Sequence, residues 1–199
     1  MNNTILILIS LLFLTGWWME EKEVTSLQDR GGVKYEINSE VGFTGVYVEK
    51  YENGQKKVEE HLKLGKRHGL YLDWYKDGQK RKETNYNDGK EEGLFTAWFE
   101  HGQKQYEGNF KKGKLEGLLT HWYENGQKKF ERKYKNGKLE GLSIGWYENG
   151  QEMIEGNYKN GKEEGLSNFW DKEGKNQSKT NYKDGKEVGL SGIKMDRRR

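Results

Sequence analysis

Residues 117–140 read GLLTHWYENGQKKFERKYKNGKLE, and this 24-residue unit returns along the chain without a change of register. One position of the unit is a tryptophan in five successive copies: Trp74, Trp98, Trp122, Trp146 and Trp170. A strict period of this length is typical of repeat arrays, in which each unit packs mainly on its neighbours. The surface of such an array is long and repetitive, which favours a binding or structural role over catalysis in a single cleft.

Each unit contains two short strand candidates, residues 117–124 and 127–135 in the quoted copy. Asn-Gly pairs at 125–126 and 136–137 follow them, and such pairs favour type I′ hairpin turns, in which both central residues have positive φ. We therefore expect an all-β fold, a single-layer antiparallel meander of stacked β-hairpin repeats. A one-layer sheet of about a dozen strands should also curl, which predicts a curved, elongated sheet.

Glycines mark the two turns of every unit. The first turn carries Gly54, Gly78, Gly102, Gly126, Gly150 and Gly174. The second turn carries Gly65, Gly89, Gly113, Gly137, Gly161 and Gly185. Three further glycines, Gly108, Gly145 and Gly156, fall inside strand candidates, where a missing side chain would relieve crowding and permit bending.

Side-chain alternation predicts two unlike faces of the sheet. Leu118 and Trp122 share a face of the first strand, and Phe130 and Tyr134 share a face of the second, whereas Glu131 points the other way. We expect one apolar, aromatic side and one charged side. On the charged side, a recurring glutamate should form cross-strand charge pairs with flanking lysines, at Glu59, Glu83, Glu107, Glu131 and Glu155.

The aromatic rows are the candidate partner-binding residues. They comprise Trp74, Trp98, Trp122, Trp146 and Trp170, together with Tyr86, Phe110, Tyr134, Tyr158 and Tyr182. These side chains either form the core of the array or line an open trough that binds a peptide or carbohydrate. An open apolar trough is typical of a partner site.

The composition does not indicate a nucleic-acid-binding, metal or catalytic site. The chain has 35 basic and 32 acidic side chains, interspersed in every unit, which indicates a solvated surface rather than a nucleic-acid footprint. The absence of cysteine excludes a disulfide framework and a thiol nucleophile. The histidines, at 61, 68, 101 and 121, occupy different repeat positions without metal-ligand spacing. We expect no enzyme activity, no cofactor, no metal and no small-molecule substrate.

The N-terminus has the character of a targeting segment. Residues 5–14 are apolar apart from one serine, and the apolar stretch to residue 19 is short for a membrane span. We expect residues 1–19 to be a helical signal peptide or signal anchor, residues 20–30 a polar linker, and residues 31–199 the repeat array. Leu14-Thr15-Gly16 resembles the start of a bacterial lipobox, but Trp17 stands where the lipidated cysteine is required, which excludes lipidation there.

The repeats resemble the MORN repeat in its bacterial variant form. The resemblance lies in Tyr-x-Asn-Gly-Gln, as at 123–127, and in Asn-Gly-Lys-x-Glu-Gly-Leu, as at 136–142, and it covers residues 42–193. It implies an extended sheet of stacked hairpins that serves as a scaffold or protein-binding module, in some members with lipid association. Some bacterial relatives carry an antitoxin label. The resemblance brings no catalytic residues.

Taken together, these features indicate an exported, non-catalytic scaffold that binds a protein at the bacterial envelope or cell surface, through its aromatic trough or its edge strands. Two alternatives stay open from the sequence. One is a cytoplasmic, antitoxin-like protein that masks a partner, and the other is a scaffold associated with membrane lipid.

Export makes a prediction about the mature chain. Mass spectrometry of the protein from fractionated source cells should find a chain shortened at its N-terminus in the exported fraction. An intact chain in the membrane fraction would instead indicate an anchor. An intact chain in the cytoplasmic fraction would contradict export.

Overall fold

The computed structural model describes residues 22–189, which form strands and turns and contain no helix. The first hairpins comprise β1 (Glu23–Val24), β2 (Gln28–Arg30), β3 (Val33–Tyr35), β4 (Gly45–Lys50), β5 (Lys56–Lys63), β6 (Lys66–Trp74), β7 (Lys80–Asn87), β8 (Lys90–Trp98) and β9 (Lys104–Lys111). The later ones comprise β10 (Lys114–Leu115), β11 (Gly117–Trp122), β12 (Lys128–Lys135), β13 (Lys138–Trp146), β14 (Glu152–Lys159), β15 (Lys162–Glu163), β16 (Gly165–Trp170), β17 (Asn176–Lys183) and β18 (Lys186–Gly189).

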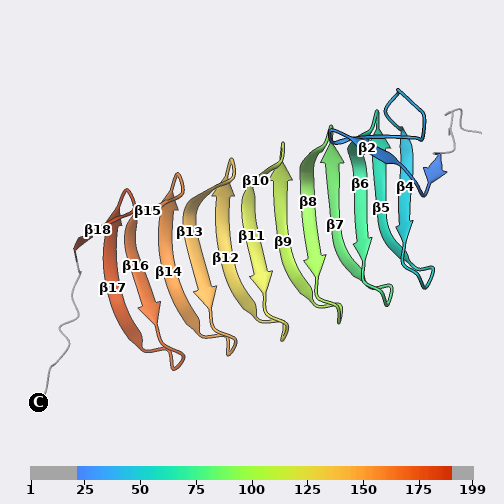
Figure 1. Ribbon diagram of the computed structural model, residues 1–199. Coiled ribbons are helices and arrows are strands. Elements are labelled where there is room, and N and C mark those ends of the chain that lie inside the picture. The colour runs from blue at the N-terminus through green and yellow to red at the C-terminus, as the bar shows by residue number, and fades with distance from the viewer. Residues whose placement is uncertain (1–21, 190–199) are drawn as a thin grey trace, which may run out of the picture.

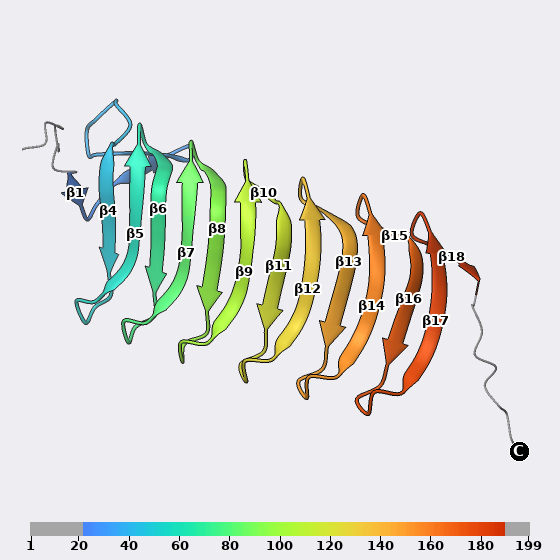
Figure 2. The same cartoon turned by 180° about the vertical axis from the view of Figure 1, so that it is seen from behind.

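All strands except β2 and β3 belong to one sheet whose order follows the chain from β4 to β18. Figure 1 shows this sheet as a single layer of bent strands, and Figure 2 shows the same layer from behind. The all-β antiparallel meander predicted from the sequence is therefore confirmed, with one parallel pair, β1 with β4, at its start. The predicted N-terminal helix lies outside the described residues, and the segment predicted as a linker, residues 20–30, contributes β1 and β2.

The two turns of each unit differ in type, which corrects the prediction of type I′ geometry at both. At the turns along the upper edge in Figure 1, both central residues have positive φ, as in Asn136 (51°) and Gly137 (78°). At the lower turns only the glycine does, as in Gly126 (83°). There the asparagine side chain holds the loop, because Asn125 Oδ1 accepts a hydrogen bond from the amide of Gln127 at 2.9 Å.

The lower turns bond each unit to the next. Tyr123 Oη donates to the carbonyl oxygen of Trp146 at 2.8 Å, and Asn125 Nδ2 donates to that of Glu148 at 2.9 Å. Equivalent tyrosine bonds start from Tyr51, Tyr75 and Tyr147. The Tyr-x-Asn-Gly-Gln signature therefore specifies both the loop and its bond to the neighbouring unit.

The upper turns are linked in a similar way. Glu116 Oε2 accepts a hydrogen bond from the amide of Asn136 at 2.7 Å, and Gly137 N donates to the carbonyl oxygen of Leu115 at 2.8 Å. Glutamates one unit away in each direction make the same contact. The glutamate of Asn-Gly-Lys-x-Glu-Gly-Leu thus accepts a hydrogen bond from the next upper turn along the chain.

The register of the hairpins corrects the predicted faces. His121 lies opposite Phe130, and Thr120 lies opposite Glu131. Because side chains alternate along a strand, Trp122 shares a face with Thr120 and Glu131, while Phe130 lies on the other face. The two aromatic rows are therefore on opposite sides of the sheet. We call the side with Trp74, Trp98, Trp122, Trp146 and Trp170 the tryptophan face, and the side with Tyr86, Phe110, Tyr134, Tyr158 and Tyr182 the tyrosine face.

Four of the five recurring glutamates form charge pairs, but along one strand rather than across two as predicted, while Glu155 has Glu152 where the other units have the lysine. Lys128 Nζ lies 2.6 Å from Glu131 Oε1, within β12. The pairing of Trp122 with Lys128 and of His121 with Phe130 leaves Lys129 as an extra residue, a β-bulge. The bulge brings residues three apart onto one face. The same pair recurs at Lys56–Glu59, Lys80–Glu83 and Lys104–Glu107.

The glycines inside the strands lie where the tyrosine face is crowded. A Cβ atom at Gly108 would lie 2.8 Å from Leu119 Cδ1, and one at Gly156 would lie 2.6 Å from Ser167 Oγ. Both approaches are shorter than ordinary van der Waals contact. These glycines therefore accommodate neighbouring side chains on the same face of the bent sheet, as the sequence indicated.

The N-terminal end of the sheet is covered by β2 and β3, which cross it in Figure 1. Lys34 of β3 donates its amide to the carbonyl oxygen of Gly65 at 2.9 Å, and its ammonium pairs with Glu60. Glu60 is only 1% exposed and also accepts from Arg67 Nε at 2.6 Å. Two cations thus compensate this buried carboxylate and fix the hairpin on the sheet.

The lower-turn tyrosine bond is absent at Phe99, which occupies the tyrosine position and has no hydroxyl. Replacing Phe99 with tyrosine should restore the bond to the carbonyl oxygen of Trp122 and raise the free energy of unfolding by about 1 kcal/mol. The matched change Tyr147→Phe should lower it by a similar amount. Urea denaturation followed by tryptophan fluorescence measures both, and a destabilised Phe99→Tyr variant would contradict this role of the hydroxyl.

Candidate functional site

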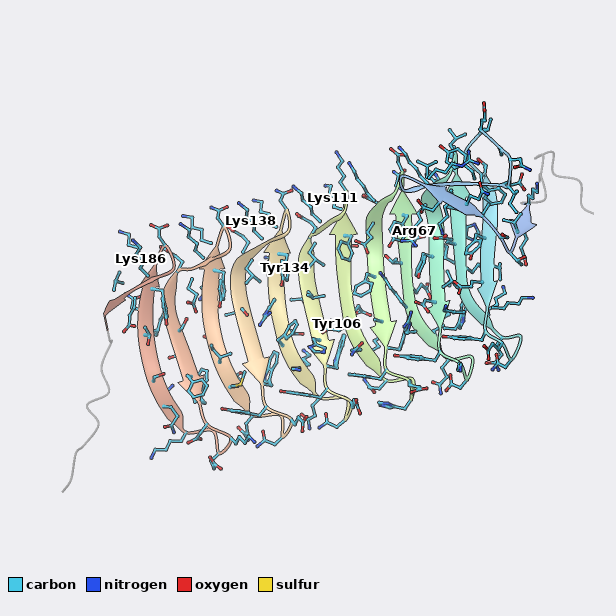
Figure 3. The ribbon with its side chains drawn as sticks, viewed as in Figure 1. Arg67, Tyr106, Lys111, Tyr134, Lys138 and Lys186 are labelled. Atoms are coloured by element: carbon cyan, nitrogen blue, oxygen red, sulfur yellow. The ribbon has the colours of Figure 1, made fainter. Side chains whose placement is uncertain are left out.

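The predicted aromatic site residues do not form one surface. The tryptophans and the tyrosine-row side chains are all half-buried, but they stand on opposite faces. In Figure 3, Arg67, Tyr106 and Tyr134 lie over the sheet, while Lys111, Lys138 and Lys186 stand along the edge of the upper turns. The predicted turn glycines lie in the turns, all with positive φ.

The tryptophan face is regular from unit to unit. Along its lower row the first three tryptophans are paired with lysines, as Trp122 is with Lys128, and Lys128 Nζ lies 5.8 Å from the ring centre of Trp146. The partners of Trp146 and Trp170 are Glu152 and Asn176. Its upper row alternates leucine with asparagine in most units, and most of these leucines are exposed, as at Leu94 (58%) and Leu118 (54%). A shallow groove of about 820 Å³ runs along this row beside Leu118 and Lys133.

The tyrosine face carries contacts between aromatic rings of neighbouring strands. Tyr71 and Tyr86 lie edge to face at 6.0 Å between ring centres, and Phe95 and Phe110 do so at 5.8 Å. On one neighbouring strand a glycine opposes the tyrosine row, as Gly117 opposes Tyr134, whereas on the other strand the partner has a side chain, as Leu139 does. This face therefore supplies much of the packing of a one-layer protein while leaving its rings half-exposed.

The centre of the tyrosine face holds the densest aromatic packing. The ring of His121 stacks on Tyr106 at 4.0 Å with 5° between the planes, and meets Phe130 edge to face at 4.9 Å. Arg132 lies over the Phe130 ring at 4.2 Å, and Lys129 lies over Tyr123 at 5.3 Å. We call Tyr106, His121, Lys129, Phe130 and Arg132 the central cluster.

His121 is held as a neutral ring in this cluster. It is 7% exposed, and its Nδ1 atom is buried without a hydrogen-bond partner. Burial, and then the positive charges of Lys129 and Arg132, lower the pKa of His121 to about 4. The ring is therefore uncharged at neutral pH. A groove of about 690 Å³ opens beside it, lined also by Tyr106, Tyr123 and Lys129.

The described residues hold no group of three or more histidine, cysteine, aspartate or glutamate side chains that could bind a metal ion. Nor does any helix long and apolar enough to cross a membrane occur between residues 22 and 189. The surface offers grooves and rings instead, which are features of molecular recognition.

Comparison with known protein families matches five consecutive stretches to the MORN repeat variant, at residues 43–63, 67–88, 91–112, 115–136 and 139–160. Together these stretches cover more than half of the chain. The chain belongs to the MORN repeat variant family. No curated protein matches the chain. Membership makes the protein a repeat scaffold, in agreement with the hairpin array seen in the structure.

The importance of His121 was missed in the sequence, although a signal was present. Within the MORN repeats its position is occupied by Asp73, Ala97, Gly145 and Phe169 in other units, whereas the tryptophan next to it is constant. Such variation inside a strict repeat marks a position that the array does not require. The sequence interpretation grouped the four histidines together and considered only whether their spacing suits a metal site.

The neutral state of His121 predicts a pH dependence of stability. In the unfolded chain His121 should have its ordinary pKa near 6.5, so between pH 6.5 and about 4 only the unfolded state gains this proton. This histidine should therefore lower the free energy of unfolding by on the order of 2–3 kcal/mol as pH falls through that range. The His121→Phe variant, which has the residue found at Phe169, should lose this component. Urea denaturation of both proteins at several pH values measures the difference, and parallel curves would contradict the assignment.

Proposed function

We propose that this protein is a non-catalytic repeat scaffold, exported to the bacterial envelope or cell surface, that binds a partner protein through its tyrosine face. The supporting observation is a contrast between the two faces. Most rows of the tryptophan face, such as its tryptophans, leucines and glutamates, repeat along the array, whereas most rows of the tyrosine face other than the tyrosine row change from unit to unit.

The contrast is clear at neighbouring positions of the repeat. On the tryptophan face, the position of Glu131 is glutamate in five successive units. On the tyrosine face, the position opposite Phe130 is filled by a different residue in each of five units, Asp73, Ala97, His121, Gly145 and Phe169. Constant residues are those that the array itself needs at every junction. A surface that changes along the array can instead match one particular, non-repetitive partner.

The side chains of the tyrosine face suit a protein interface. Tyrosine, phenylalanine and arginine are enriched at protein interfaces, and here half-buried rings stand beside Arg132. Packing against their neighbours holds these rings in place before a partner arrives, as the 4.0 Å stack of Tyr106 and His121 shows. Such preorganisation lowers the entropic cost of binding.

Export is supported by the apolar segment at residues 5–14, which has the length of the apolar core of a signal peptide. A chain without cysteine can function outside the cell, since disulfides are optional there. The proposed partner is accordingly a protein of the envelope or of a surface that the cell contacts.

Site-specific photo-crosslinking tests which face of the sheet binds the partner protein. A benzophenone amino acid placed at Tyr134, on the tyrosine face, should give a discrete protein adduct in source cells. The matched position is Leu118, which is 54% exposed on the tryptophan face and should give none. Excess wild-type protein should compete the adduct away. Adducts from Leu118 alone, or adducts to lipid alone, would contradict the proposal.

A further inference from the structure

Cations and carboxylates on the N-terminal half of the tyrosine face are matched within the protein. Lys57 Nζ, on a bulge, lies 2.6 Å from Glu49 Oε1. At the same positions one unit later, the guanidinium of Arg81 pairs with Asp73, with Nε 3.0 Å from Oδ1. Each pair joins the bulge residue to the residue before the constant tryptophan or its counterpart. These two units therefore supply their own counter-charge.

The other cations of that half are matched as well. Arg67 and Lys34 both contact Glu60, and Lys82 Nζ lies 3.5 Å from Glu91 Oε1. This pattern is expected, because a cation held against aromatic rings loses part of its hydration and is stabilised by a nearby carboxylate.

The central cluster departs from this pattern. Its bulge residue is again a cation, Lys129, but the residue that should supply the carboxylate is His121. Arg132 adds a second cation at the position where Glu60 stands three units earlier. Within residues 22–189, neither Lys129 nor Arg132 has a carboxylate oxygen within 4.0 Å. The centre of the face thus carries two cations without an internal counter-charge.

The neighbouring groups do not supply that counter-charge. Glu124 and Glu148 line the same groove as Lys129 without pairing with it, and Glu163 contacts the hydroxyl of Tyr158 at 3.4 Å. Arg132 lies over the Phe130 ring, and a guanidinium can donate the two parallel hydrogen bonds that a carboxylate accepts.

His121 gives a second, independent indication of an incomplete site. Its ring is 93% buried beside the groove, yet Nδ1 has no hydrogen-bond partner. Buried polar atoms are nearly always paired, since an unpaired one costs about 1–3 kcal/mol. A bound segment that adjusts this ring could satisfy the nitrogen.

We propose that the partner presents an acidic peptide segment to the central cluster, an inference that rests on the proposed function. Aspartate or glutamate side chains of that segment pair with Lys129 and Arg132, and adjacent apolar side chains pack on Tyr106 and Phe130. The partner's carboxylates thereby supply the counter-charge that Glu49 and Asp73 supply in the first two units.

A peptide fits this surface better than a lipid headgroup. The two cations lie within one unit of a bent sheet and each lies over an aromatic ring, whereas membrane binding by electrostatics relies on a larger cluster of exposed basic residues. The mixed charge of the groove, with Glu124 and Glu148 beside Lys129, also disfavours an extended anionic surface.

Fluorescence anisotropy with labelled synthetic peptides tests the inference on the full chain. The probe is a short peptide of alternating glutamate and tyrosine, compared with matched glutamine–tyrosine and lysine–tyrosine peptides. The glutamate peptide should bind at least about tenfold more tightly than the glutamine peptide, and this advantage should shrink as salt is added. Equal binding of the two peptides, or tighter binding of the lysine peptide, would overturn the inference.

Variants locate the site. Lys129→Gln and Arg132→Gln should each reduce binding of the glutamate peptide by about tenfold. The His121→Asp variant should do the same while keeping both cations, because it restores the internal pair seen at Asp73 and Arg81. The control is Lys133→Gln, which removes the same charge next to Arg132 but on the tryptophan face, and it should leave binding unchanged. Thermal melts by circular dichroism check that all four variants are folded.

The outcomes separate this inference from the proposed function. If the cross-link from Tyr134 persists in Lys129→Gln and Arg132→Gln while the glutamate peptide fails to bind, the acidic segment is refuted and the tyrosine-face interface stands. If vesicles containing phosphatidylserine bind with the same residue dependence and the peptide does not, the site recognises lipid and the inference is wrong. Loss of the cross-link in the charge variants but not in Lys133→Gln supports both.

Discussion

A single layer of strands has no second layer to pack against, so the hairpins of this protein must be joined at their turns. The tyrosine hydroxyl at 123 bonds the next unit at the lower edge, and the carboxylate of Glu116 bonds the next turn at the upper edge. These contacts need specific residues in every unit, which is why the MORN signature concentrates in the turns. The rest of each strand is left to pack on its neighbours and to face the solvent.

The two faces of the strands also differ in how much they vary along the array. Bulges place lysine and glutamate pairs beside the tryptophans, and this arrangement recurs with little change. On the opposite face, glycines make room for rings, and the remaining positions vary from an ion pair to a histidine stack to a glycine. Since stability depends mainly on the constant parts, the variable face is free to acquire a partner-specific pattern. The central cluster is the place where this variation leaves charge uncompensated.

The sequence predicted the architecture because period, glycines and Asn-Gly pairs all follow from local backbone geometry. It did not predict the faces, because alternation holds within a strand but not across a turn. Between Trp122 and Phe130 the chain passes through a lower loop and a bulge at Lys129. Counting residues across this segment therefore does not tell whether the two side chains lie on the same face of the sheet. The lower-turn type was missed for a related reason, since Asn125 acts through its side chain rather than through positive φ. The central cluster depended on register and could be recognised only once the hairpins were aligned.

The bonds between units are the same at each junction where the signature is intact, and this has an evolutionary consequence. A copied unit carries a donor tyrosine and an acceptor carbonyl at matching places, so an in-frame duplication inserts a hairpin that finds partners on both sides. Each unit lengthens the ribbon by two strand spacings, about 9.6 Å. The number of repeats can therefore change by duplication within the gene while the fold is preserved. A duplicated unit adds residues to the tyrosine face, and mutations at these residues can be selected for binding to a new partner.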